Sequence, residues 1–335
     1  MEMKIKILGV ILVVIMISSL FLITNISGAF VLEGQTDLVK VRMGNLPVIH
    51  ALPVYLAIEK GYFKEAGIDL ELIELEAPNQ IIDGLIQGRL DFTSTSGAAG
   101  VSGVANYKNP GKIKLYALSG GTTEQPGDAV VVPIDSEIKS ISELKGKKLG
   151  IMGGSIQWRM LAKDLLAKNG FEMDKDVFVV EIAIGTHVTA LASKQVDALL
   201  TIEPVISTVI NNKIGKIISR GPLEELVADP FYPGAGLVSV KFAQENPEVT
   251  AKIIEIIRKA NIEVQENPDE ARQYLKKYTP LNDELAKTVS LAVIKTCDKF
   301  EQSDIEALQK FYDIFLTYGV VESKINVEDI IYCKK

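Results

Sequence analysis

The sequence predicts an α/β protein made of two similar lobes, on the strength of three observations. Short apolar strands alternate with helices between residue 39 and about residue 220, which is typical of βαβ units and a largely parallel sheet. The order strand, loop, helix, glycine, strand occurs at 44–75 and again at 150–182. Two passages rich in glycine and proline, 119–133 and 231–236, accompany apolar strands and are expected to carry the chain between the lobes. Two crossings mean that one unit is inserted within the other, a topology that favours a hinge.

The elements of the first unit follow from local patterns. Ile68, Leu70 and Leu72 alternate with Asp69 and Glu71, as in a strand with one buried face. The strands expected in this unit are 38–46, 68–75, 90–93 and 113–118; the helices are 53–60, 81–87 and one that opens with the small residues 94–100.

The second unit repeats these signals. Gly153-Gly154-Ser155 leads into a helix that continues to about Lys168, and Gly170 ends it. The strands expected here are 148–152, 177–184 and 197–202, with a helix near 188–193 and crossing strands at 129–132 and 237–240. We therefore expect lobe 2 to comprise 129–234 and lobe 1 to comprise 37–128 and 235–335.

The remaining residues are predicted to be helical and to brace the first lobe and the hinge. Asn246 followed by Pro247 has the pattern of an N-cap with proline in the first helical position. Further helices are expected at about 285–295 and 305–317.

Composition excludes some functions. The 335 residues are 47% hydrophobic and 24% charged, as in an ordinary globular protein with a sizeable core. The formal net charge is −7, and lysine and arginine are scattered rather than clustered. Because a nucleic-acid-binding protein normally carries a basic stripe, no nucleic-acid partner is expected.

The first residues have the pattern of an export signal. Lys4 and Lys6 precede an apolar run at 7–26, and small residues follow at 27–29, where a signal peptidase is able to cut. The run is also close to the length that spans a bilayer as a helix. We therefore expect 1–36 to be a signal peptide or an N-terminal membrane anchor, with the rest of the chain outside the cytoplasm.

Cysteine and histidine are scarce. Cys297 and Cys333 are the two cysteines, and His50 and His187 are the two histidines, so no zinc site, other metal site or cofactor is expected. In an oxidising compartment the two cysteines are able to pair. The alternative, which we favour at this point, is a buried Cys297 and an unpaired Cys333 in the tail.

A ligand site is expected where strands end and helices begin. In open α/β sheets ligands bind beyond the carboxyl ends of the strands, where helix N-termini favour anions and oxygen-rich groups. The ligand-binding candidates that this rule selects are His50, Ser94, Thr95, Ser96, Gly154, Ser155, Gln157, Glu203 and Tyr232.

Several candidates have a structural alternative. Hydroxyls at 94–96 are also suited to cap a helix, and Glu203 is also suited to complement a helix dipole. Tyr232 is placed either to close over a ligand or to pack in the hinge. Trp158 shares a helix face with Leu161 and Leu165, which favours core packing over ligand stacking. The glycines at 153–154 lack the spacing and the lysine of a P-loop, so nucleoside triphosphates are disfavoured, and no catalytic motif is present.

An ordered set of motifs resembles a known family. These motifs are the segment Ala51–Ile68, the segment Gly88–Phe92, the segment Ile141–Ile151 followed by Gly154-Ser155, the segment Gln195–Ala198, and Glu203-Pro204. In combination they are similar to the nitrate/sulfonate/taurine-type (NMT1/THI5-like) substrate-binding proteins of ABC transporters. The resemblance covers roughly residues 39 to 275.

The resemblance implies a type II periplasmic-binding-protein fold, with two Rossmann-like lobes and two hinge crossings. It implies capture of a small polar or anionic solute, nitrate/sulfonate/taurine-like or pyrimidine-like, and delivery to a permease with an ATPase partner. By position, the family's binding residues fall near His50, Ser94, Thr95, Ser155 and Glu203. The expected location is the periplasm or the outer face of the cell membrane, attached through 7–26 if that run is not cleaved.

Two rival functions stay open. Related pyrimidine-precursor synthases share the fold but carry a cluster of cysteines in one short motif, whereas Cys297 and Cys333 are isolated here. A sensory binding module, anchored by 7–26, is the second rival.

Overall fold

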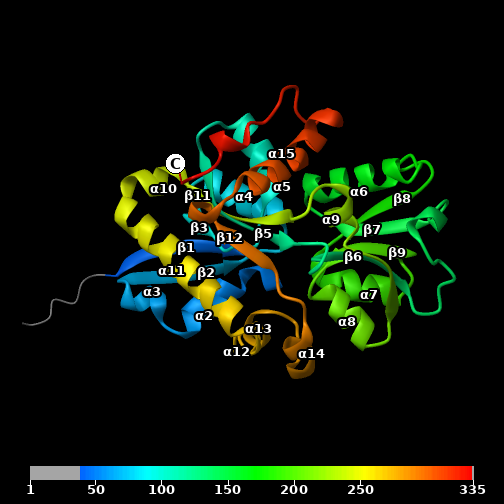
Figure 1. The fold of residues 1–335 in the computed structure, drawn as a ribbon, viewed down its shortest axis with the longest axis horizontal. Helices are drawn as coiled ribbons and strands as arrows, with labels where there is room; N and C mark the ends of the chain where they lie inside the picture. The colour runs from blue at the N-terminus through cyan, green and yellow to red at the C-terminus, as the bar shows by residue number, and fades with distance from the viewer. Residues whose placement is uncertain (1–37, 334–335) are drawn as a thin grey trace, which may run out of the picture. The chain divides into compact units, whose positions relative to one another are not determined.

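Strands far apart in the chain form the two β-sheets of residues 38–333, which the computed structural model describes (Figure 1). The predicted signal peptide or anchor at 1–36, with its apolar run 7–26, lies outside the described residues. Within 38–333 no helix combines the length and the apolar character needed to cross a bilayer.

Lobe 1 is the part of the chain built on the larger sheet. Its strands run in the order β12-β5-β11-β3-β1-β2, and β4 pairs with β11 beside this path. They are β1 (Val39–Asn45), β2 (Ile68–Glu74), β3 (Phe92–Thr93), β4 (Gly97–Ala98), β5 (Ile113–Gly121), β11 (Phe231–Ser239) and β12 (Val293–Thr296). Lobe 2 is built on the smaller sheet, in the order β10-β6-β9-β7-β8. Its strands are β6 (Asp128–Pro133), β7 (Lys148–Met152), β8 (Phe178–Ile182), β9 (Ala198–Ile202) and β10 (Gly215–Arg220).

The two sheets repeat one topology. In lobe 1, β1 pairs in parallel with β2 and β3, with Val39 opposite Ile68 and Met43 opposite Phe92. In lobe 2, β7 pairs in parallel with β8 and β9 in the same way. Next to this trio each sheet receives an antiparallel strand that arrives from the other lobe: β11 beside β3, and β6 beside β9. The chain therefore crosses between the lobes after β5 and again before β11.

Equivalent glycines show why the repeat is visible in the sequence. A Cβ on Gly44 in β1 would lie 2.6 Å from the Leu90 side chain, and one on Gly150 in β7 would lie 2.5 Å from the Leu199 side chain. Each parallel sheet thus requires a residue without a side chain at the same place, so that apolar groups pack directly on the backbone.

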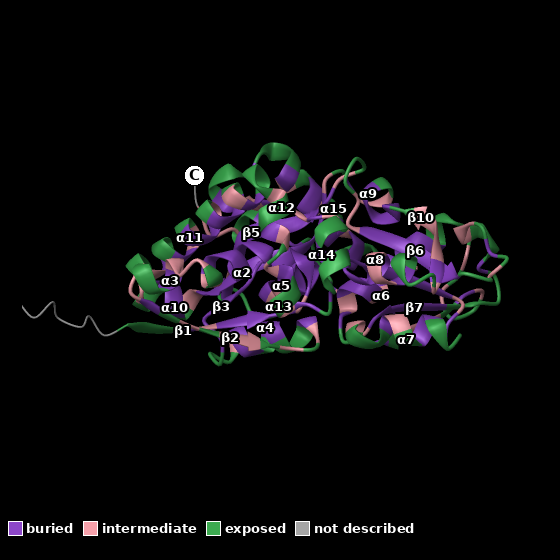
Figure 2. Cartoon of the chain, turned by 90° about the horizontal axis from the view of Figure 1, so that it is seen from below, coloured by how far each residue is buried: buried purple, intermediate pink, exposed green. Residues whose placement is uncertain are grey.

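Helices cover the sheets of both lobes, and their outward faces are exposed, while the central strands β11, β6 and β9 are buried (Figure 2). In lobe 1 they are α2 (Leu52–Glu59), α3 (Tyr62–Glu65), α4 (Pro78–Ile86), α5 (Ala99–Lys108), α10 (Val240–Glu245), α11 (Pro247–Glu266), α12 (Pro268–Arg272), α13 (Leu275–Tyr278), α14 (Asp283–Thr288) and α15 (Gln302–Thr317). In lobe 2 they are α6 (Ile156–Lys168), α7 (His187–Ala192), α8 (Val205–Asn211) and α9 (Pro222–Leu226).

Two expectations about the C-terminal part are wrong. The helix expected at about 285–295 ends at Thr288, and Val293–Thr296 instead form β12 on the edge of the lobe 1 sheet, against β5. Val293, Ile294 and Thr296 are β-branched residues, which fit the pleated surface of a sheet. Their partner strand, β5, is over 170 residues away in the chain, so the local sequence does not indicate the pairing.

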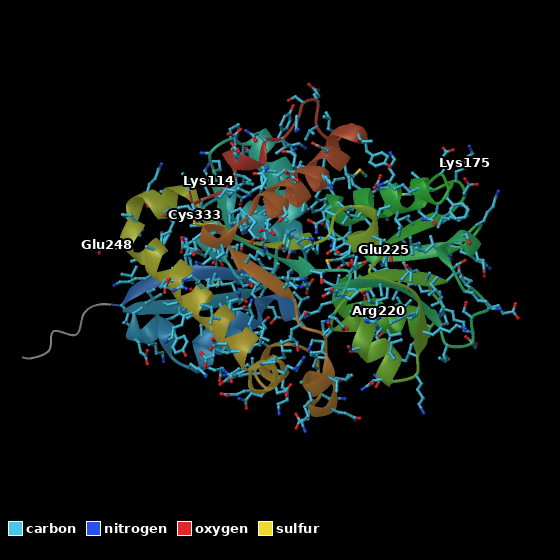
Figure 3. The ribbon with its side chains drawn as sticks, in the orientation of Figure 1. Lys114, Lys175, Arg220, Glu225, Glu248 and Cys333 are labelled. Carbon is cyan, nitrogen blue, oxygen red and sulfur yellow. A yellow bond between two sulfur atoms is a disulfide. The ribbon has the colours of Figure 1, made fainter. Side chains whose placement is uncertain are left out.

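The second correction concerns the cysteines. Cys297 and Cys333 form a disulfide, with Cα atoms 5.6 Å apart, so Cys333 is not an unpaired tail residue. The end of the described chain returns along β5, where Leu115 pairs with Ile331, and this return brings Cys333 to Cys297. Cys333 lies near Lys114 (Figure 3), in the wall of the same surface pocket.

Candidate ligand-binding site

A small cavity lies between the two lobes, where strands of both sheets end. Its volume is about 30 Å³, which is room for roughly one water molecule. Its wall consists of Leu46, Val48, His50, Pro78, Ser96, Gly97, Ala98, Met152, Gln157, Trp158, Ile202, Pro233 and Gly234. This wall is mostly apolar and carries no acidic residue, lysine or arginine; its polar side chains are those of His50, Ser96 and Gln157.

The imidazole of His50 is buried and has a ring nitrogen that lacks a hydrogen-bond partner among the described residues. It lies in the short 3₁₀ turn η1 (Ile49–Ala51) that follows β1, and it is 2% exposed. Its Nε2 has no hydrogen-bond partner. Burial lowers the pKa of His50 to about 4, so the ring is neutral at ordinary pH. A buried polar atom without a partner is costly, and a ligand in the cavity would satisfy it.

Ser155 supplies a second polar atom without a partner, from the opposite lobe. It occupies the N-cap position of α6, yet its hydroxyl caps no backbone N–H of that helix. Its Oγ is buried and has no hydrogen-bond partner. The residues after it, Gln157 and Trp158, line the cavity. Ser155 itself is not part of the cavity wall, but it precedes these two wall residues at the start of α6, and the first turn of a helix favours oxygen-rich or anionic groups.

Gly154 lies where lobe 2 closely approaches lobe 1. Its φ is +67°, and a Cβ on it would lie 2.8 Å from the side chain of Ala77, just before α4 in lobe 1. Both the backbone conformation and the available space therefore require glycine here.

Gln157 joins the lobes instead of pointing an unsatisfied group into the cavity. Its Oε1 accepts a hydrogen bond of 2.9 Å from the Gly100 N–H at the start of α5, and its Nε2 donates one of 3.0 Å to the Pro233 carbonyl in β11. It is 2% exposed. The amide thus satisfies one of the free donors of a lobe 1 helix from a lobe 2 helix.

The hydroxyls at 94–96 form a buried network behind the cavity. Ser94 Oγ donates to Asn45 Oδ1 at 2.8 Å, and the Thr95 hydroxyl donates to the His50 carbonyl. Ser96 lines the cavity, and its Oγ accepts from the Leu46 N–H at 2.9 Å. The capping alternative for this segment is not seen, since α5 begins after Ala98 without a side-chain cap. They fix the segment that carries His50.

Glu203 and Tyr232 are outside the cavity wall. Both carboxylate oxygens of Glu203 accept hydrogen bonds from Ser207, one from its N–H at 3.0 Å and one from its Oγ at 2.9 Å. Burial raises the pKa of Glu203. The Tyr232 hydroxyl donates to Asp304 Oδ1 at 2.7 Å, which ties β11 to α15. The polar atoms of both residues therefore have protein partners, as the structural alternatives expect: a helix-dipole role for Glu203 and hinge packing for Tyr232.

The apolar wall was missed by sequence reasoning, which selected polar residues and Gly154. Met152 and Ile202 are the last residues of β7 and β9, and Leu46 directly follows β1, so the strand-end rule contains the signal for them. Trp158 is buried in the core, as its helix face predicts, and it also lines the cavity. In the described part of the chain no three histidine, cysteine, aspartate or glutamate side chains lie together as metal ligands would.

Comparison with known proteins agrees with this architecture. A proposed aliphatic sulfonates-binding protein of Bacillus subtilis (strain 168) is 26% identical over 326 residues, which is 95% of this chain and 93% of that protein. The 4-amino-5-hydroxymethyl-2-methylpyrimidine phosphate synthase THI5 of Saccharomyces cerevisiae is 24% identical over 85% of this chain and 83% of its own.

Solved structures show the same fold. The alkanesulfonate-binding protein SsuA of Xanthomonas axonopodis pv. citri, bound to MOPS, superposes with a TM-score of 0.72 at 17% identity, covering 88% of this chain and 99% of that one. This fold is that of periplasmic binding proteins, as the motifs imply. Since the sequence profile described as NMT1/THI5 like matches residues 49–271, which is well over half of the chain, the protein belongs to the NMT1/THI5-like family.

Proposed function

We propose that the chain is the extracytoplasmic solute-binding component of an ABC importer and that it is not an enzyme. The observation that carries this proposal is a pair of buried polar atoms without a hydrogen-bond partner among the described residues. One is Nε2 of His50, a residue of the cavity wall in lobe 1, and the other is Oγ of Ser155 in lobe 2, which lies outside the wall and two residues before Gln157 of the wall. One solute between the lobes would satisfy both atoms at once. Solute-binding relatives over nearly the whole chain support the same reading.

The wall chemistry favours a compact solute with one oxygen-rich end. No charged side chain lines the cavity, so a neutral imidazole, a hydroxyl and the start of α6 would bind that end. Trp158, Met152 and Ile202 would contact the rest of the solute. We therefore propose a nitrate-, sulfonate- or taurine-like anion, or a neutral pyrimidine-like heterocycle.

Binding requires the lobes to move. A cavity of about 30 Å³ is smaller than any such organic solute, so the lobes must separate to admit it and close around it. We take lobe 2 as 129–234 and lobe 1 as 37–128 with 235–335. In the closed state both sets of contacts form, and the solute favours that state for this reason. A permease and an ATPase would be the partners that receive the solute, in the periplasm or at the outer face of the cell membrane.

A synthase acting on a pyrimidine precursor is the second candidate, because THI5 is a relative. Against it stands the cysteine chemistry: the sequence has two cysteines, and both are consumed by one disulfide. No clustered thiols are left for catalysis.

A thermal-shift screen tests the proposal. We expect a saturable rise in melting temperature with at least one of taurine, ethanesulfonate, nitrate or 4-amino-5-hydroxymethyl-2-methylpyrimidine, because a ligand of the native state stabilises it by mass action. The rise should be lost in Ser155→Phe and weakened in Ser155→Ala, and kept in Ser142→Phe, whose serine is exposed on lobe 2. Formation of 4-amino-5-hydroxymethyl-2-methylpyrimidine phosphate by the purified protein would contradict the transport assignment.

A further inference from the structure

Two carboxyl groups are buried together where the chain passes between the lobes. Asp128 is the first residue of β6, directly after the first crossing, and Glu224 lies in α9, just before the second. Each residue is 2% exposed. Carboxyl groups are rarely buried to this degree without a cation.

Each of the two acids accepts a hydrogen bond from the segment that carries the other. Asp128 Oδ1 accepts a hydrogen bond of 3.3 Å from the Leu223 N–H, at the start of α9. Glu224 Oε1 accepts one of 2.8 Å from the Gly127 N–H, in the first crossing. Glycine at 121 makes room for this, since a Cβ there would lie 2.3 Å from Glu224 Oε1. The pair therefore links the segments that lead into and out of lobe 2.

The remaining oxygen of each acid lacks a donor. Among residues 38–333, Asp128 Oδ2 and Glu224 Oε2 are buried without a hydrogen-bond donor, although the two side chains lie within hydrogen-bonding reach of each other. An ionised carboxylate only accepts hydrogen bonds, whereas a protonated one donates one. A single added proton would serve both oxygens.

The surroundings supply no positive charge to the pair. Within residues 38–333 neither carboxyl forms an ion pair. Lys168 on the neighbouring α6 is bound to Asp164 and to the Leu226 carbonyl, and Arg220 at the end of β10 acts on Glu203. A further acid, Asp229, repels negative charge on Glu224. Burial, with the neighbouring carboxylate, raises the pKa of Asp128 well above its ordinary value, and burial raises the pKa of Glu224.

We propose that Asp128 and Glu224 form a one-proton site in the hinge, in which a shared proton joins the two crossing segments. With the proton bound, the pair is an acid–carboxylate hydrogen bond that holds both segments in register. Without it, two negative charges face each other in a buried place and push the segments apart. Proton binding at this site therefore makes hinge stability depend on pH. The inference does not depend on which solute the cleft takes.

Infrared spectroscopy of the full-length protein at about pH 7 tests the proton directly. Ordinary aspartate and glutamate are ionised at this pH, so a carbonyl stretching band of a protonated carboxyl marks a group with a raised pKa. We expect this band in the wild type and its loss in Asp128→Asn and in Glu224→Gln. Either amide donates the missing hydrogen bond and leaves its partner ionised. Glu225→Gln, at an exposed position on the same helix (Figure 3), should leave the band unchanged.

The melting temperature provides the second measurement. Because the folded-state pKa values are raised, the wild type should lose stability as pH rises above the ordinary carboxyl pKa, while the two amide variants lose less. Between about pH 5 and pH 8 we expect the wild type to fall by at least about 3 °C more than either variant, and Glu225→Gln to follow the wild type. If one of the two amide variants fails to fold, comparison of the wild type with the other variant still tests the proposal.

Three results would overturn the proposal. One is a wild-type spectrum at about pH 7 without a protonated-carboxyl band. Another is a pH dependence of melting that is the same in the wild type and in both amide variants. A melting temperature that rises with calcium chloride and falls with EDTA only when both acids are present would also overturn it, since a cation would then occupy the place of the proton.

Discussion

The side chain of Gln157 accepts a 2.9 Å hydrogen bond from the backbone N–H of Gly100, so a lobe 2 side chain caps a lobe 1 helix. The same amide donates to the Pro233 carbonyl in the crossing strand β11. The conformation described here is therefore one in which the lobes are closed on each other.

Gln157→Leu should shift the protein toward an open state. The substitution removes two buried hydrogen bonds, each worth about 1 kcal/mol, so the ratio of closed to open molecules should fall by roughly 30-fold. The distance between spin labels at Lys64→Cys in lobe 1 and Lys175→Cys in lobe 2 reports this change. The native cysteines do not interfere, because both are in the disulfide.

Gln195→Leu, at an exposed position of lobe 2, serves as the control and should keep the wild-type distance distribution. A Gln157→Leu distribution identical to that of the wild type would show that the amide does not hold the lobes together.

His50→Gln should make the protein less sensitive to acid. Burial lowers the pKa of His50 to about 4 from an ordinary 6.5, so the unfolded chain takes up a proton there before the folded one does. The stability contributed by this group is full above pH 6.5 and is lost as pH falls toward 4. Relative to the variant, the wild type should lose about 2–3 kcal/mol across this range in urea unfolding.

His187 offers a matched comparison for that experiment. Burial also lowers its pKa to about 4, but its ring nitrogens contact Thr201 Oγ1 and the Ile182 carbonyl. At neutral pH His187→Gln should thus cost about 1–3 kcal/mol, whereas His50→Gln, which breaks no bond of Nε2, should cost less. Equal losses for the two variants at neutral pH would contradict the assignment of a free Nε2.

Reduction of the Cys297–Cys333 disulfide should destabilise the protein by about 3–4 kcal/mol, because the bond closes a loop with a sequence separation of 36 residues. Urea unfolding with and without a reductant measures the change. The double variant Cys297→Ser/Cys333→Ser should have the lower stability from the start and show no response to the reductant. If complete reduction leaves the free energy of unfolding of the wild type unchanged, the disulfide does not make this contribution.

The sequence contained enough to predict the layout of the two sheets, because βαβ units have local signals. The glycines at 44 and 150 and the repeated strand–helix order are examples, and the order of parallel strands is the same in both lobes. Pairing between segments that are far apart in the chain has no such local signal in the sequence. β12 finds β5 only in the folded chain, and Cys333 reaches Cys297 only because the tail runs along β5.

The sequence pointed to part of the cavity wall and said less about the roles of its residues. The rule that ligands bind beyond strand ends selected His50, Ser96 and Gln157, which line the interlobe cavity, and also Ser155, which does not. It could not distinguish a free polar atom from a bonded one. Ser94, Glu203 and Tyr232 have suitable chemistry, but partners from distant segments or the next helical turn occupy their polar atoms. Which partner a hydroxyl finds is a tertiary property.

Tyr232→Phe separates structure from binding at this site. The Tyr232 hydroxyl donates to Asp304, which is fully buried and also paired with Lys295, so its loss should cost about 1–3 kcal/mol of stability. Because the Tyr232 hydroxyl is already bonded to Asp304, the affinity for any solute that raises the melting temperature of the wild type should stay within about 2-fold, as measured by calorimetry below the melting range of the variant. Ser155→Ala should behave in the opposite way, with weakened binding and nearly unchanged stability, since its Oγ has no partner to lose. A Tyr232→Phe protein that keeps its stability but loses the solute would place the tyrosine in the site after all.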